Sequence, residues 1–293
     1  MVEPTGKPTS AAPWAIILAA GKGTRMADGT AGDTTSAVRP KVVYPVADRP
    51  MVCWVVDACR AAGVERCVIV VGYEADQVRD ALAEYDDCVY VEQHEQLGTG
   101  HATRMAQPMF DAATPRDTFV LAGDGPLIRP TTLENLLRVH RETGAGATLA
   151  TAVLDDPSGY GRVLRDEAGG FGRIVEQKDA SPDERTVREV NPSYYCFRSD
   201  LLFDALSRVT NDNKQGEYYV TDVPAMLKAE GHTVSVVDAV PPDDVLSINT
   251  PAHLAQVDAI MRRRLATSGA AAAGGAGGGG RSSEHVSSKG EGA

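Results

Sequence analysis

Residues 14–26 constrain the fold of this chain more than any other segment. They begin with an apolar, β-prone run and break into a turn of small residues that contains Gly21, Lys22, Gly23 and Arg25. α/β proteins use such a strand-to-helix turn to bring backbone N–H groups and cations to a phosphate chain. The segment therefore predicts an α/β fold with a phosphate site at the end of its first strand.

A glycine turn alone is weak evidence for phosphate binding, because an ordinary strand-to-helix turn with solvated charges has the same sequence. Lys22 is followed by Gly23 rather than Ser or Thr, so the turn is not a Walker A loop, and its glycine spacing is not that of a dinucleotide site. Pro40 and Lys41 add a second cation from a rigid turn just before another apolar run. Two cationic sites fit a triphosphate better than one and indicate a nucleotide-handling enzyme.

Strand-like apolar runs alternate with helical patterns through most of the chain, less regularly from residue 148 onward, which is typical of βαβ units on a parallel sheet. We expect strands at 16–19, 67–73, 88–92, 118–122, 148–154, 172–177 and 190–197. Helices are expected at 50–63, 75–84, 100–110, 133–142 and 251–265, with a capping box formed by Thr131 and Glu134 before the fourth. Ligands of parallel sheets lie outside the carboxyl ends of the strands, and both the glycine turn and Asp124 fall at such ends.

Composition excludes several classes of function. With 293 residues, 43% of them hydrophobic and 24% charged, the chain is expected to be globular, and it has no apolar stretch long enough to span a membrane. Its net charge of −11, without a clustered Lys/Arg patch, makes nucleic acids and anionic membrane surfaces poor candidates as partners. The five scattered cysteines indicate buried thiols in a reducing cytoplasm rather than zinc ligands or disulfides.

The ends of the chain differ from its middle in composition. Residues 1–13 hold one lysine and no apolar core, and we expect a loose leader without a signal peptide. Residues 14–265 carry the alternating pattern of a single folded domain. Residues 266–293 form a Gly/Ala/Ser tract with almost no large apolar side chain, so burial cannot offset their ordering entropy and disorder is expected.

Several separated motifs strengthen the interpretation as a nucleotide enzyme. They are LAAGKGTRM at 18–26, PK at 40–41, EQLGTGHA at 95–102, GD at 123–124, GYGR at 159–162, IVEQKDA at 174–180, EVN at 189–191 and QGEYYVTD at 215–222. In this order they resemble the sugar-phosphate nucleotidyltransferases, and within them the uridylyltransferase domain of the bacterial bifunctional enzyme that makes UDP-N-acetylglucosamine. The resemblance spans about residues 14–265. It implies a Rossmann-like, GT-A-like α/β fold with a mostly parallel central sheet and a smaller sugar-binding half.

The activity implied by the resemblance is transfer of a uridylyl group from UTP to a sugar 1-phosphate, with Mg²⁺ as the cofactor. N-acetylglucosamine 1-phosphate or an analogue is the first candidate acceptor, and pyrophosphate is the second product. Two alternatives stay open: the same chemistry with another nucleotide or with a secondary-metabolite sugar or cyclitol phosphate, and a catalytically silent subunit that binds nucleotide sugars. The oligomeric state also stays open.

The resemblance also assigns roles to individual residues. Arg25 and Lys41 are the expected catalytic cations, and Asp124 and Asn249 the expected Mg²⁺ ligands. The expected nucleotide site consists of Leu18, Ala20, Gly21, Gly23, Thr24, Gln93, Gln96, Gly98 and Thr99. The expected sugar site consists of Gly161, Glu176, Asn191, Glu217, Tyr219 and Thr221. Within these sets Gln93 is expected to donate to a uracil carbonyl, whereas His94 and His101 are expected to be structural.

This chain departs from the family pattern in several places. Residues 27–39 form a longer, Gly/Thr/Asp-rich linker, which is plausible as a mobile flap over the triphosphate. Ala122 stands where an aromatic residue is usual, and Asn191 is followed by Pro192 and Ser193 instead of Thr/Ser-Gly. Both of these changes concern the expected sugar pocket. Hexapeptide repeats do not follow residue 265, so acetyl transfer is not expected.

Overall fold

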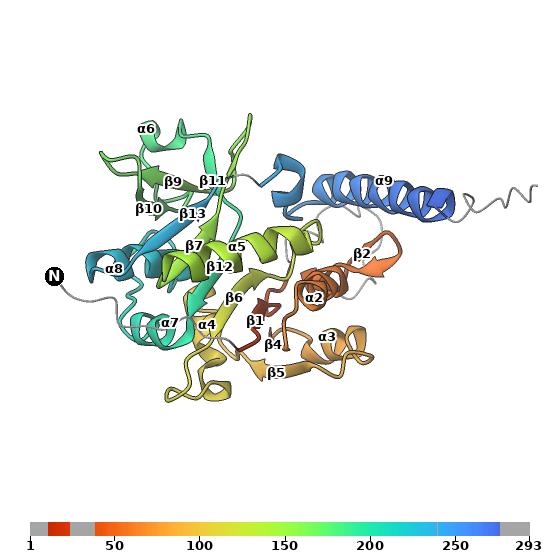
Figure 1. The fold of residues 1–293 in the computed structure, drawn as a ribbon, viewed down its shortest axis with the longest axis horizontal. Coiled ribbons are helices and arrows are strands. Elements are labelled where there is room, and N and C mark those ends of the chain that lie inside the picture. Colours follow the sequence, from red (N-terminus) through yellow and green to blue (C-terminus); the bar gives the residue numbers. More distant parts are fainter. Residues whose placement is uncertain (1–10, 24–38, 239, 276–293) are drawn as a thin grey trace, which may run out of the picture.

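The computed structural model describes residues 11–23, 39–238 and 240–275. A seven-stranded sheet forms the centre of the fold (Figure 1). From one edge to the other its strands are β13 (Val234–Val237), β7 (Ala147–Ala150), β12 (Tyr194–Arg198), β6 (Asp117–Ala122), β1 (Trp14–Leu18), β4 (Arg66–Val71) and β5 (Cys88–Glu92). Only β12 runs antiparallel to its neighbours, so the predicted mostly parallel sheet is confirmed.

Helices cover both faces of this sheet because its central strands are apolar on both sides. Ile16 and Ile17 of β1 are both fully buried, yet they belong to two separate hydrophobic clusters, one on each face. The cluster around Ile17 includes side chains of α2 (Met51–Ala61), α3 (Ala75–Ala81), α5 (Pro130–Thr143) and α9 (Pro251–Gly275). The cluster around Ile16 includes side chains of α4 (Thr99–Met105), α7 (Ser199–Leu206) and α8 (Val223–Ala229).

A second, four-stranded sheet stands beside the β13–β7 end of the large sheet (Figure 1). It is antiparallel throughout, in the order β10 (Phe171–Val175), β9 (Gly161–Arg165), β11 (Glu189–Asn191) and β8 (Ala152–Val153). The remaining elements are the hairpin β2 (Pro45–Val46) and β3 (Arg49–Pro50), helix α6 (Pro182–Arg185), and the 3-10 turns η1 (Lys41–Val43), η2 (Gln107–Met109), η3 (Val220–Asp222) and η4 (Pro242–Val245).

The predictions of single strands at 148–154 and 190–197 are wrong. Each segment forms two short strands, β7 and β8 in the first case and β11 and β12 in the second, and each passes from one sheet to the other. The second break falls at Pro192, which has no N–H to donate to a ladder, and at Ser193, whose φ is 62°. The result is a corner between the sheets, and Asn191 lies at it.

Two helix ends also differ from expectation. Helix α5 begins at Pro130 and has no side-chain cap, because a proline in the first turn has the φ of a helix and places Thr131 inside that turn rather than before it. Helix α9 continues to Gly275, past the predicted end at residue 265, because its added residues include a run of alanines, the strongest helix formers. Residues 1–10 of the predicted leader and 276–293 of the predicted tail lie outside the described residues.

Two further expectations can be compared with the structure. All five cysteines are free, and four of them are buried. Along the part of the chain that the structure describes, none of the helices has both the length and the apolar character that crossing a membrane requires.

Candidate active site

The ends of β1 and β6 lie side by side at the carboxyl edge of the large sheet. The two strands are parallel neighbours, and Leu18 at the end of β1 pairs with Ala122 at the end of β6. The backbone N–H of Gly123 then donates to the carbonyl oxygen of Leu18 at 3.0 Å. Two segments far apart in sequence, the glycine turn and Asp124, are therefore brought together at the edge where ligands of parallel sheets bind.

A cation already lies between the two predicted metal ligands. The ammonium of Lys41 pairs with the Asp124 carboxylate, and its Nζ is 2.7 Å from Oδ1 of Asn249. Lys41 is the first residue of η1 and packs beside Gly23. Gly23 has a φ of +62°, and a Cβ added to it would lie 3.0 Å from Cβ of Lys41, so a side chain there would displace Lys41. The backbone N–H of Ile248 donates to the Asp124 carbonyl at 3.3 Å and holds the Asn249 segment in place.

This donor set fits a hard divalent cation. Asp124 and Asn249 direct one carboxylate and one amide oxygen at a single point, which the Lys41 ammonium marks. Among the described residues no group of three or more His, Cys, Asp or Glu side chains could hold a metal ion. An ion here would therefore complete its shell with phosphate oxygens and water, as magnesium ions at nucleotide sites do.

The turn predicted to bind phosphates is only partly described. Leu18 and Ala20 lie at the end of β1, and Gly21 is exposed beyond them. The ammonium of Lys22 lies 5.7 Å from the centre of the Tyr73 ring. Two of the predicted residues, Thr24 and Arg25, and most of the predicted flap, residues 27–38, lie outside the described residues.

The predicted base loop packs against the predicted sugar segment. Gly98 has a φ of +108°, and a Cβ there would lie 2.5 Å from the Tyr218 carbonyl oxygen, so a side chain would separate the two segments. The hydroxyl of Thr99 accepts from the backbone N–H of Val220 at 3.1 Å. The predicted base loop and the predicted sugar segment are thus joined directly.

Gln93 is buried and already engaged within this loop. Its Nε2 lies 3.2 Å from the Gly98 carbonyl oxygen and 3.0 Å from Nδ1 of His101, and the Gln96 amide donates to the Gln93 carbonyl at 3.3 Å. Burial lowers the pKa of His101, which favours the neutral ring that can accept from Gln93. His101 therefore orients Gln93, in keeping with its expected structural role, and donation from Gln93 to a base stays a prediction.

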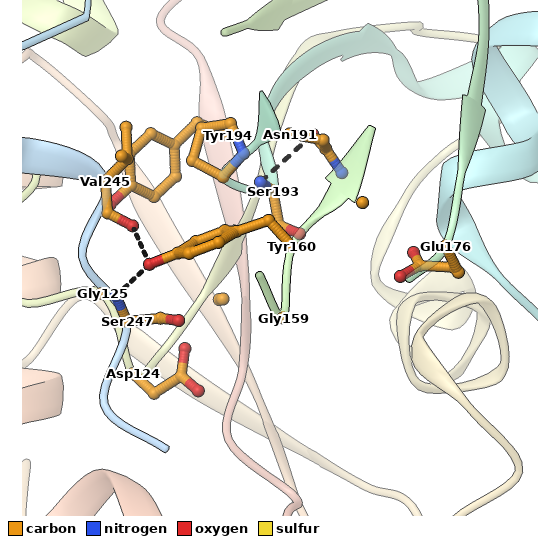
Figure 2. Close-up of a pocket in the computed structure, with 13 residues that line it drawn as sticks. Asp124, Gly125, Gly159, Tyr160, Glu176, Asn191, Ser193, Tyr194, Val245 and Ser247 are labelled. Carbon is orange, nitrogen blue, oxygen red and sulfur yellow. Dashed lines mark hydrogen bonds between the residues drawn. The ribbon is translucent and has the colours of Figure 1, made fainter. Parts of the chain in front are cut away.

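A polar pocket of about 180 Å³ opens beside Asp124 (Figure 2). Three residues of the predicted sugar set line it, namely Gly161, Glu176 and Asn191. Burial raises the pKa of Glu176, while a hydrogen bond from the Thr221 hydroxyl, 3.1 Å from Oε1, opposes that rise. A carboxylate with one bonded oxygen and little solvent is a strong acceptor for sugar hydroxyls.

The other predicted sugar residues are not part of the pocket lining. Thr221 supports Glu176 from behind, and the Tyr219 hydroxyl lies 3.3 Å from Oδ2 of Asp179. Glu217 belongs to the segment packed against Gly98. Asn191 does line the pocket, but its Nδ2 donates to the Tyr195 hydroxyl at 2.6 Å and its Oδ1 accepts from the Ser193 N–H at 3.2 Å.

Sequence reasoning missed part of the pocket wall. Tyr160 lies in the GYGR motif but was given no role, and Ser247 sits in an irregular segment with no pattern around it. Tyr160 donates to the Val245 carbonyl and accepts from the Ser247 N–H, both at 3.3 Å (Figure 2). Ala122 and Ser193, two of the positions at which this chain departs from the family pattern, also line the pocket, as does Gly125.

Comparisons with known proteins agree with this geometry. The chain is 46% identical over 251 residues to the bifunctional protein GlmU of Pelobacter propionicus, a stretch that covers 86% of this chain and 52% of that protein. It is 45% identical over 251 residues to the bifunctional protein GlmU of Geobacter metallireducens, which covers 86% of this chain and 51% of that protein. It is 46% identical over 253 residues to the bifunctional protein GlmU of Brevibacillus brevis, which covers 86% of this chain and 52% of that protein. The chain thus spans about half the length of these curated relatives.

The match to a family covers most of the described fold. Residues 15–225 match the family described as the MobA-like NTP transferase domain, a range that includes the glycine turn, Lys41, Asp124 and the pocket residues from Ala122 to Tyr194, but not Val245 or Ser247 of the pocket wall. A match of this extent, together with the sequence identity to these relatives, establishes the family of the domain. The chain belongs to the family of MobA-like NTP transferase domains.

Proposed function

We propose that this domain transfers a uridylyl group from UTP to a sugar 1-phosphate, N-acetylglucosamine 1-phosphate or a close analogue, and releases pyrophosphate. One observation carries the proposal. Lys41, Asp124 and Asn249 converge on a single cation position, and Asp124 also lines the polar pocket that contains Glu176 and Asn191. A phosphate-binding cation site and a hydroxyl-binding pocket that share one residue suit a reaction between a nucleotide and a sugar phosphate.

The chemistry needs little from the protein beyond position and charge. A phosphate oxygen of the sugar attacks the α-phosphorus of UTP, the bond from that phosphorus to the β-phosphate oxygen breaks, and pyrophosphate leaves with the electron pair. The attacking oxygen is already ionised, so no proton relay is required. Catalysis then rests on alignment of the two phosphates and on neutralisation of the charge that develops between them.

The cations have distinct roles in this scheme. Asp124 and Asn249 would hold Mg²⁺, which supplies charge stabilisation at the phosphate oxygens. Lys41 lies within reach of the same point and would turn its ammonium from Asp124 to the phosphates of a bound nucleotide. Arg25, which lies outside the described residues, is proposed to act with it.

The two substrate pockets give the proposed specificity. Glu176 would accept hydrogen bonds from sugar hydroxyls, the backbone at Gly161 would lie against the ring, and Asn191 would fix the corner between the sheets. The Gln93–Thr99 loop, closed from below by the segment around Tyr218, would admit a pyrimidine more readily than a purine.

Pyrophosphate release tests the proposal. The wild-type protein should release pyrophosphate from UTP only when a sugar 1-phosphate is added, with N-acetylglucosamine 1-phosphate among the best acceptors. Asp124→Asn should reduce turnover by roughly 10²–10³-fold, because charge neutralisation at the phosphates is lost. Asp204→Asn, which changes an exposed carboxylate of α7, is the matched control. Absence of pyrophosphate release with every sugar phosphate, or full activity in Asp124→Asn, would contradict the proposal.

A further inference from the structure

The side-chain amide of Asn249 contacts both the cation position and a residue that lines the proposed sugar pocket. Its Oδ1 faces the Lys41 ammonium at 2.7 Å, and its Nδ2 donates to the hydroxyl oxygen of Ser247 at 3.1 Å. Only the oxygen end of an amide can face a cation, so the bond to Ser247 fixes the plane in which Asn249 presents its ligand atom. Ser247 is itself part of the pocket wall.

Ser247 is in turn held by Tyr160. The Tyr160 hydroxyl accepts from the backbone N–H of Ser247 and donates to the carbonyl oxygen of Val245, each at 3.3 Å. Figure 2 shows the Tyr160 ring crossing the pocket, with its hydroxyl turned toward these two residues and away from Glu176. Tyr160 lies between Gly159 and Gly161, both of which line the pocket.

These contacts form one continuous path. It runs from the sugar loop at 159–161 through the Tyr160 hydroxyl to Ser247, and from the Ser247 hydroxyl to Asn249 and the cation position. The segment has little freedom to respond in any other way, because Val245 and Ile248 on either side of Ser247 are buried. A displacement of the sugar loop therefore displaces Asn249.

We propose that Tyr160 and Ser247 are positioning residues that couple the sugar pocket to the divalent-cation site. A sugar phosphate that orders the 159–161 loop also holds Asn249 in its ligand geometry, and by thermodynamic reciprocity cation binding strengthens sugar binding. The inference rests on the proposed function, in which Asp124 and Asn249 hold the ion.

The test measures binding of Mn²⁺ to the protein saturated with a non-hydrolysable UTP analogue. Electron paramagnetic resonance quantifies the free ion. In the wild type, N-acetylglucosamine 1-phosphate should lower the Kd for Mn²⁺. In Ser247→Ala and Tyr160→Phe, each of which removes one hydroxyl and keeps the rest of the side chain, the Kd should rise about threefold to tenfold and the sugar effect should shrink. Ser247→Thr, which keeps the hydroxyl, should restore wild-type binding.

A control variant separates this coupling from general damage to the pocket. Ser193→Gly removes a hydroxyl from the same wall, at a φ of 62° that glycine adopts without strain, and has no bond to the 245–249 segment. It should leave the Kd for Mn²⁺ unchanged, whatever it does to sugar binding. Steady-state kinetics give a second readout: Ser247→Ala should lose activity at limiting Mg²⁺, recover most of its kcat at saturating Mg²⁺, and keep the KM for UTP.

The inference is overturned if Ser247→Ala and Tyr160→Phe bind Mn²⁺ as the wild type does and respond equally to the sugar phosphate. This outcome is distinct from failure of the proposed function, which is judged by pyrophosphate release from the wild type. Binding of Mn²⁺ needs no turnover, so the coupling is measured whether or not the wild type reacts.

Discussion

Lys41 shows at the scale of one residue how this site stays intact without its substrates. Its ammonium pairs with Asp124 and lies 2.7 Å from Oδ1 of Asn249, which keeps two oxygen ligands together that would otherwise face each other without a cation. The three side chains are only slightly exposed, so the pairing is weakly screened by solvent. On the proposed function, we expect substrate phosphates and a metal ion to exchange with Lys41 at this point.

Glu176 gives a prediction at the same scale. Burial raises the pKa of its carboxyl, so as the pH falls the side chain gains a proton earlier than an ordinary glutamate and loses acceptor capacity for sugar hydroxyls. The acid limb of kcat/KM for the sugar phosphate should therefore lie above the usual range of a glutamate. Glu176→Gln should lower kcat/KM roughly 10-fold to 100-fold and remove that limb.

The pH profile of kcat/KM, measured for both proteins, checks this. Substrate phosphates also titrate on the acid side, so the quantity to compare is the difference between the wild-type and Glu176→Gln profiles. Profiles of identical shape would contradict a role for the Glu176 carboxylate in sugar binding.

At the scale of elements, helix α5 carries a buried histidine against the large sheet. Nδ1 of His140 lies 3.0 Å from the Thr148 hydroxyl of β7, and desolvation lowers the pKa of His140 to about 4 although Asp117 opposes the shift. The folded state thus binds this proton less readily than the unfolded state, in which the pKa is about 6.5. Stability conferred by the neutral ring is present above about pH 6.5 and is lost as the pH falls toward 4.

Urea unfolding at pH 7 and pH 5 measures this loss. The wild type should lose on the order of 2 kcal/mol between these values from His140 alone. His140→Asn, which keeps a partner for Thr148 but does not titrate, should be less stable at pH 7 and should lose less on acidification. An equal loss in both proteins would show that His140 binds its proton as readily in the folded state as in the unfolded state.

The turn η4 carries a fully buried carboxylate, that of Asp244. Asp244 pairs with Nε of Arg129 at 2.6 Å and with Arg264 of α9, and its carbonyl accepts from the Tyr194 hydroxyl at 2.9 Å. It ties η4 to the start of α5 and to α9, and the segment that follows leads to Ser247 and Asn249. The position of the cation site therefore depends on a carboxylate outside it.

Asp244→Asn should destabilise the fold by about 2 kcal/mol, less than for a fully buried pair because both arginines are partly exposed. The midpoint of urea unfolding gives the value, and Asp204→Asn on the surface of α7 should change it by less than about 0.5 kcal/mol. A change of similar size in the two variants would mean that the buried pairing contributes nothing specific.

The elements also show where sequence reasoning succeeded and why it failed elsewhere. Strands β1, β4 and β6 were predictable because they are continuous apolar runs covered on both faces. The break at Thr151 was not, because apolar residues continue on both sides and only tertiary pairing decides which sheet each half joins. The break at Pro192 has a signal in the sequence, the proline itself, which the apolar residues farther along on both sides obscured. The start of α5 was misplaced because the Thr131–Glu134 pattern outweighed the proline before it.

At the scale of the whole molecule, the topology of the fold brings together site residues that lie far apart in the sequence. Lys41 and Asn249 are 208 residues apart in sequence, yet their side chains meet. Asp124 could be assigned to the ligand edge from the strand that precedes it, whereas Asn249 was found only through resemblance to a known family. The Tyr160 hydroxyl bonds to the backbone at Val245 and Ser247, and the Ser247 hydroxyl bonds to the Asn249 amide, and no residue pattern in a single sequence encodes such contacts.

The central claim is that this fold joins a uridine nucleotide to a sugar phosphate, and one competition experiment tests it most directly. The protein is incubated with Mg²⁺, N-acetylglucosamine 1-phosphate and equal concentrations of UTP, CTP, ATP and GTP, and the nucleotide sugars formed are quantified by mass spectrometry. The account predicts UDP-N-acetylglucosamine in at least about tenfold excess over any purine product, because the proposed base loop, whose Gly98 packs against the Tyr218 backbone, is expected to admit a pyrimidine more readily than a purine. A nucleotide sugar made from CTP, ATP or GTP as the main product, or no nucleotide sugar at all, would contradict it.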